Sequence, residues 1–161
     1  MLRAREAQIG CHMDGLSLAI LIGIVTGMRA MMAPAAVSWA ARLGHLGLTG
    51  WLAFLNGPWT PWLLTLLAAG ELITDQLPST PSRTVPVQFG TRLFVGAVCG
   101  SAVGGGPAGA LAGVVGALIG TLGGGALRAR LAKSFGNDRP AALVEDAIAI
   151  ALALLVIASV R

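Results

Sequence analysis

The sequence predicts an all-α fold, a polytopic membrane helix bundle of about five transmembrane helices with Gly-rich packing. Three observations predict it: 55% of the 161 residues are hydrophobic, only 11% are charged, and the mean hydropathy is +0.79. A soluble domain carries about 25% charged residues, so this chain has too few to cover a water-facing surface. Lipid is the expected surrounding. One transmembrane domain, residues 15–161, is expected to follow a cytoplasmic N-terminal segment, residues 1–14.

The first predicted helix covers residues 15–41, an apolar stretch that contains Arg29 and Pro34. At a helical rise of about 1.5 Å per residue, it is long enough to cross a bilayer with a tilt or to break at Pro34. Its start also resembles the core of a signal peptide, but the apolar residues continue to Trp39, which opposes that alternative. Helix breakers and tryptophans follow in residues 42–61, as expected of an interfacial loop.

Four further helices are predicted, separated by a Pro-rich segment, a Gly-Pro turn and a basic segment at 128–139. Glycines in G-x-x-x-G spacing place small residues on one face of the fourth helix, as close helix contacts in membranes require. Asn137 or Asp138 is expected to cap the last helix. The predicted ranges are 59–77, 88–105, 108–127 and 140–159.

The basic residues predict the topology. With the N-terminus in the cytoplasm, the inside segments hold eight Lys or Arg residues and the outside segments hold two. This agrees with the positive-inside rule and puts the C-terminus outside. The same rule accounts for the net charge of +4, so nucleic acid is not an expected partner.

Arg29 is the most informative residue, because a charge near the middle of a membrane helix is costly unless it faces the bundle interior and pairs. Glu71 and Asp75, four residues apart, share one face of the second helix, and Glu71 is the expected partner of Arg29. A buried glutamate without a cation tends instead to take up a proton, which proton-coupled carriers use. Two structural alternatives stay open: Arg29 snorkels to an interface, or the pair is a static ion pair.

Further charged candidates lie near the predicted cytoplasmic face. Glu145 and Asp146 are about two turns into the last helix, where the helix dipole alone favours one acidic residue, and Arg128 is expected to pair with one of them. Arg83 and Arg92 are candidates for contact with an anion, although a rigid turn is the favoured interpretation of the Pro-rich segment. No catalytic, metal-binding or cofactor spacing occurs, so none of these is predicted.

Two weakly similar units raise the hypothesis of an inverted repeat. GIVTGMR ends at Arg29, GTLGGGALR ends at Arg128, and each is matched to an acidic helix. Three helices of chain separate the two units, so they are expected to have opposite orientations, as in many transporters.

Four stretches together carry a family resemblance: GMRAMMAPAAVSWA at 27–40, GELITDQLPSTPSR at 70–83, GTLGGGALR at 120–128 and ALVEDAIAI at 142–150. In these stretches the chain resembles an uncharacterised bacterial integral-membrane family, domain of unknown function 4126. The resemblance implies a bacterial membrane protein. It implies no substrate and no catalytic residue.

The leading hypothesis is a small transporter or permeation protein of the bacterial inner (plasma) membrane, acting on an unknown small substrate or ion. Five short spans enclose little volume, so a homo-oligomer within the lipid bilayer is expected. The alternatives are a non-transporting scaffold or assembly factor and a membrane enzyme acting on lipid phosphate headgroups. The residues proposed for the site are Arg29, Glu71, Asp75, Arg128, Glu145 and Asp146.

Overall fold

The computed structural model describes residues 14–75 and 85–160, which form six α-helices and one 3-10 helix and contain no strand. The all-α prediction is confirmed for these residues. Arg83 and the N-terminal segment 1–13 lie outside them. The elements are α2 (Gly15–Met28), α3 (Met32–Arg42), η1 (Gly50–Asn56), α4 (Thr60–Thr74), α5 (Pro86–Gly104), α6 (Gly106–Phe135) and α7 (Asp138–Ser159).

The first predicted helix is not continuous: α2 and α3 meet at a break. Arg29 has extended backbone angles, φ −140° and ψ 108°, and α3 begins at Met32. Pro34 lies in the first turn of α3, where its missing N–H removes no intrahelical hydrogen bond. In a continuous helix the same ring would clash with the carbonyl of Ala30. The chain therefore breaks one turn before the proline, and not at it.

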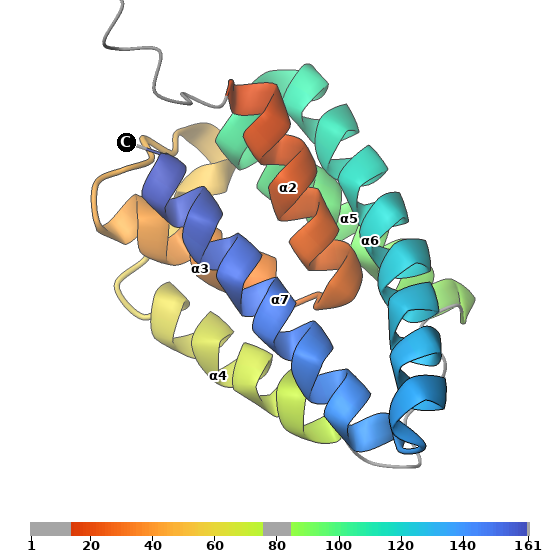
Figure 1. Cartoon of the computed structure of the whole chain (residues 1–161). Helices are drawn as coiled ribbons and strands as arrows, with labels where there is room; N and C mark the ends of the chain where they lie inside the picture. Colours follow the sequence, from red (N-terminus) through yellow and green to blue (C-terminus); the bar gives the residue numbers. More distant parts are fainter. Residues whose placement is uncertain (1–13, 76–84, 161) are drawn as a thin grey trace, which may run out of the picture.

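The two helices form a hairpin whose outer ends lie at the same end of the bundle. A Cβ added at Gly15 would lie 3.4 Å from the Cα of Gly104, the last residue of α5. Just after α3, Leu46 borders a narrow apolar gap together with Val103 and Val160. Figure 1 shows α3 turning back from the lower end of α2. A bundle of five crossings is therefore not confirmed, because the segment expected to form the first crossing returns to the end where it starts.

The longest helix, α6, packs against α2, α5 and α7. Because Gly116 lies against Ile20 and Gly120 lies against Ile24, α2 and α6 run parallel to each other. Figure 1 shows the two helices side by side. The inverted repeat required these two glycine-rich helices to have opposite orientations, so that hypothesis is wrong.

Glycines allow α6 to approach its neighbours within backbone contact. A Cβ added at Gly113 would collide with the carbonyl oxygen of Gly96 on α5, and one added at Gly120 would collide with that of Ile24 on α2. Side chains on this face would hold the helix axes apart. The predicted small-residue face of the helix is confirmed.

α6 also continues to Phe135, well beyond its predicted end, so most of the expected basic loop is helix. The Leu, Ala, Arg and Lys residues of this stretch are strong helix formers, which explains the extension. The helix ends where Gly136 adopts a left-handed conformation with φ 66°. Asn137 then caps α7 by accepting a hydrogen bond from the amide of Arg139 at 3.2 Å.

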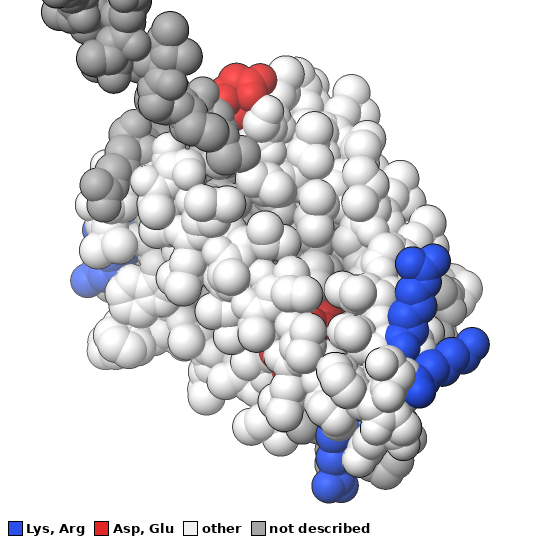
Figure 2. Space-filling model, viewed as in Figure 1, with Lys and Arg blue, Asp and Glu red and all other residues white. Residues whose placement is uncertain are grey.

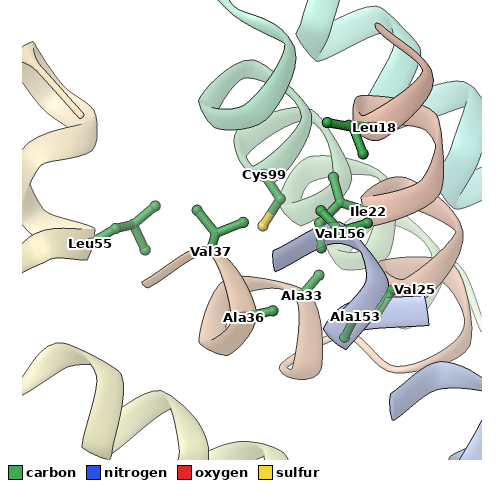
Figure 3. Close-up of a cluster of buried hydrophobic side chains, with 10 residues drawn as sticks. All are labelled: Leu18, Ile22, Val25, Ala33, Ala36, Val37, Leu55, Cys99, Ala153 and Val156. Atoms are coloured by element: carbon green, nitrogen blue, oxygen red, sulfur yellow. The ribbon is translucent and has the colours of Figure 1, made fainter. Parts of the chain in front are cut away.

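An apolar cluster fills the space between α2, α3, α5 and α7, with one side chain from η1 (Figure 3). Cys99 is fully buried in this cluster near Ile22 and Val37, which agrees with a role as a small packing residue. The cluster fixes the hairpin of α2 and α3 against the longer helices.

The outer surface is apolar along most of its length. Leu66 and Ile73 on α4 are each 69% exposed, and Trp59, which immediately precedes α4, is 79% exposed. In the face shown in Figure 2, the blue side chains lie mainly near the ends of the molecule, with white surface between them. Among the described helices, α6 and α7 are long and apolar enough to cross a membrane by length and composition.

The glycine contacts predict the effect of a single methyl group. We expect Gly113→Ala to lower the free energy of unfolding by about 1–3 kcal/mol, since added volume in a tight contact forces the backbones apart. Gly123→Ala is the matched control on the same helix, because a Cβ there meets nothing within 4 Å. Thermal unfolding of the detergent-solubilised variants measures the difference. Equal midpoints for both variants would refute the close packing of α6.

Candidate functional site

Arg29 lies in the break between α2 and α3, and its side chain is fully buried. Its Nε donates a hydrogen bond of 2.6 Å to Oδ1 of Asp146 on α7. Its Nη1 forms an ion pair with Oδ2 of Asp75, the residue that caps the C-terminus of α4. Two carboxylates from separate helices thus enclose one guanidinium, which is how a buried charge is tolerated in an apolar bundle.

Glu71 accepts hydrogen bonds from the backbone amides that immediately precede α3. Its Oε1 accepts a hydrogen bond from the amide of Ala30, and its Oε2 accepts one from the amide of Met31, each at 2.8 Å. Both amides lie in the break immediately before α3, where the backbone lies outside both helices and supplies no intrahelical acceptor. A negative charge at a helix N-terminus is also favoured by the helix dipole.

Arg92 donates a hydrogen bond to a backbone carbonyl on the other side of the break, at the end of α2. Its Nη1 donates a hydrogen bond of 2.8 Å to the carbonyl of Gly27, and the hydroxyl of Thr121 lies 3.3 Å from the same oxygen. Nη2 of Arg92 is 3.6 Å from Oε1 of Glu71. The carbonyls of one helix end and the amides of the next are therefore linked through one ion pair.

Arg128 connects the C-terminal part of α6 to α7 and α4. Its Nε and Nη2 donate to the two carboxylate oxygens of Asp138 at 3.0 and 2.5 Å. Nη2 also lies 3.4 Å from the backbone carbonyl of Asp75, and Nη1 lies 4.0 Å from Oε2 of the fully buried Glu145. The second arginine predicted from the sequence therefore lies beside the first site.

The structure brings together all of the residues predicted for the site. The prediction that Glu71 pairs with Arg29 is wrong in detail, because Glu71 binds backbone amides and faces Arg92, while Asp75 and Asp146 hold Arg29. Arg92, a candidate for contact with an anion, is buried inside α5, where it binds the carbonyl of Gly27 and faces Glu71. The snorkelling alternative for Arg29 is also wrong, since its side chain is 1% exposed.

Sequence reasoning missed Asp138 and Thr121. The sequence predicts Asp138 only as a possible helix cap, whereas in the structure it binds Arg128 across the connection between α6 and α7. Thr121 carries no signal in the sequence, because its contact with Gly27 exists only where α6 and α2 run side by side.

We call the buried and half-buried ionisable groups of this region the charged cluster. Among the described residues no group of three or more His, Cys, Asp or Glu side chains has the geometry to hold a metal ion. Its members are Arg29, Arg92, Arg128, Glu71, Asp75, Glu145 and Asp146.

An apolar groove of about 290 Å³ opens between α3, α4 and α7. Leu72 and Ile150 line its walls, and they lie three residues before Asp75 and four residues after Asp146. Residues at these spacings share a helix face. Asp75 and Asp146 therefore lie about one helical turn beyond Leu72 and Ile150, and no ionisable side chain among the described residues lines the groove itself.

Comparison with known proteins gave no match to a family model, to a curated protein or to a solved structure.

The contacts at the break predict that Glu71 contributes to stability. We expect Glu71→Ala to lower the free energy of unfolding by about 1–3 kcal/mol, the usual effect of leaving buried polar groups without a partner. Glu71→Gln should lose less, because an amide oxygen still accepts one of the two hydrogen bonds. Thr91→Ala is the control, since its exposed hydroxyl bonds only to its own helix. Thermal midpoints in detergent should fall in the order Thr91→Ala, Glu71→Gln, Glu71→Ala. A midpoint for Glu71→Ala equal to the control would contradict the assigned role.

Proposed function

We propose that this chain is a small carrier of the bacterial plasma (inner) membrane, and that the charged cluster at the break between α2 and α3 binds its substrate or coupling ion. The observation that carries the proposal is the burial of Arg29 between Asp75 and Asp146 at an interrupted helix. Interrupted helices with polar ends directed at a central site are a recurring feature of transporters. Ionisable groups inside a membrane protein commonly mark the path of an ion or substrate.

The membrane arrangement that we propose has four crossings, formed by α4, α5, α6 and α7, with α2 and α3 as a re-entrant hairpin. Backbone that is not helical is tolerated at membrane depth only where protein buries it, which is the environment of the break. In this proposed arrangement, the positive-inside rule puts Arg130, Lys133 and Arg139 in the cytoplasm. The described ends, Asp14 and Val160, then both face the outside, which differs from the cytoplasmic N-terminus expected from the sequence.

Cysteine labelling in intact cells tests this arrangement. Single cysteines replace Asp14, Gly47 and Lys133 in a background of Cys11→Ser and Cys99→Ala. We expect an impermeant maleimide to label positions 14 and 47 from the same side, because the hairpin returns to its starting end. Position 133 should be labelled from the opposite side only. Labelling of 14 and 133 from one side would restore a bundle of five crossings.

Transient currents test the carrier proposal itself. Proteoliposomes on a solid-supported membrane are exposed to steps of pH, Na⁺ and small organic ions. We expect a current that depends on the protein and falls at least tenfold in Asp146→Asn, because this variant changes the charge beside Arg29. Asp14→Asn is the control, since Asp14 is exposed and distant from the cluster. The absence of any current from a correctly folded protein would refute the carrier proposal.

A scaffold with a static ion network is the second candidate, and the pairing of Arg29 with two carboxylates is compatible with it. Exchanging the charges of Arg29 and Asp146 in one double variant separates the two. A scaffold should keep its function if the exchanged pair still folds, since only attraction is needed. A carrier should fold and lose its current.

A further inference from the structure

We infer that the C-terminal end of α6, together with the start of α7, binds the headgroup of an anionic phospholipid whose acyl chain lies along the outer face of α6. The inference rests on the membrane arrangement proposed above. It goes beyond the carrier function, because the residues that carry it lie outside the charged cluster. These residues are Arg130, Lys133 and Arg139.

An apolar stripe runs along the outer face of α6 and ends at two basic side chains. Its residues follow one another at spacings of three or four, which places them on one face of the helix. A surface that is apolar along most of its length and cationic at one end is complementary to a lipid with an anionic headgroup. The exposed stripe consists of Leu111, Val115, Ile119, Leu122 and Ala126, and it continues into Arg130 and Lys133.

The length of α6 places these basic residues at the depth of lipid headgroups. The helix has 30 residues, and at a rise of about 1.5 Å each it is about 45 Å long, close to the thickness of a bilayer with its headgroup layers. Residues 106–127 contain no charged residue. Their length of about 33 Å matches a hydrocarbon core of about 30 Å. Arg130 and Lys133 then lie about 5 and 9 Å beyond the core, within the headgroup layer.

The three basic side chains are exposed, and no carboxylate in the described part of the chain forms an ion pair with them. Asp138, the exposed acidic residue next to Arg139, is bound by Arg128 through both of its carboxylate oxygens. Figure 2 shows blue side chains around the end of the molecule where α6 meets α7 in Figure 1. This end therefore keeps three positive charges that an anionic group from outside the chain can neutralise.

The connection between α6 and α7 holds Arg139 close to the last turns of α6. α6 ends at Phe135 and α7 begins at Asp138, and the bond between Asp138 and Arg128 ties the start of one helix to the other. A phosphate group has several acceptor oxygens, so one headgroup can accept hydrogen bonds from more than one of these side chains. Guanidinium groups bind phosphate through two parallel hydrogen bonds, and lysine binds it as a point charge.

The apolar surroundings of the basic end favour a lipid over a nucleic acid. Phe135 is 50% exposed, and Leu143, which lies four residues after Arg139 and shares its helix face, is 57% exposed. These side chains and the stripe on α6 offer a nucleic acid nothing to bind, whereas they can contact an acyl chain. A zwitterionic lipid carries its own cation beside the phosphate, so it gains less from the three basic residues.

Native mass spectrometry of the full chain in detergent tests the inference. The probes are phosphatidylglycerol and phosphatidylcholine with identical acyl chains, which differ in the net charge of the headgroup. We expect the first phosphatidylglycerol to bind at least tenfold more tightly than phosphatidylcholine. Equal affinities for the unaltered chain would overturn the inference.

Variants at the two ends of the molecule locate the binding. Each basic residue near an anionic lipid contributes about fivefold in affinity, so the double variant Arg130→Gln, Lys133→Gln should bind phosphatidylglycerol at least tenfold more weakly. Lys133→Gln alone, with a loss of about fivefold, replaces it if the double variant does not fold. Arg42→Gln is the matched control, because Arg42 is an exposed basic residue at the end of α3. It should change the affinity less than twofold. Equal losses at both ends, or no loss at either, would refute the location.

Two competitors separate a lipid from other anions. Glycerophosphoglycerol, the headgroup without acyl chains, should bind at least tenfold more weakly than phosphatidylglycerol, and equal binding would assign the basic end to a soluble phosphate. At physiological ionic strength an oligothymidylate should not displace the lipid. Displacement would assign these residues to nucleic acid and overturn the inference.

The outcome is distinguishable from that of the carrier proposal, because lipid binding is measured without any current. Selective binding of phosphatidylglycerol in a protein that gives no current would keep this inference and refute only the carrier. A current from a protein that binds both lipids equally would keep the carrier and refute only this inference.

Discussion

The structure depends on one constraint: a helix that breaks inside an apolar bundle exposes carbonyls at one end and amides at the next, and these must be satisfied without water. Arg92 satisfies the carbonyl of Gly27, and Glu71 satisfies the amides of Ala30 and Met31. Because these two side chains come from α5 and α4, the break ties both helices to the hairpin.

The break also explains the position of Arg29. A residue in the extended conformation between two helix ends projects its side chain away from both helix surfaces, here toward α4 and α7. A guanidinium buried there needs carboxylates on both sides, which Asp75 and Asp146 supply. The backbone interruption and the charged cluster are thus two parts of one structure, and neither would be stable in an apolar environment without the other.

The glycines of α6 allow this helix to lie close enough to α2 and α5 for the hydrogen bonds at the break to form. Backbone contact with α2 and α5 brings Thr121 and Arg92 within reach of the end of α2. The apolar helices around the cluster leave the side chains of Asp75 and Asp146 only 13% and 10% exposed.

The sequence by itself determined the helical class, the small-residue face of α6, and which six charged residues, Arg29, Glu71, Asp75, Arg128, Glu145 and Asp146, lie together in the structure. Each of these depends on local spacing or on the cost of charge in an apolar run. Only the tertiary structure decided that residues 15–42 return as a hairpin, that α2 and α6 run parallel and that Glu71 binds amides instead of Arg29. These features depend on which helices lie side by side, and several carboxylates in one chain can each neutralise the same arginine until packing selects among them.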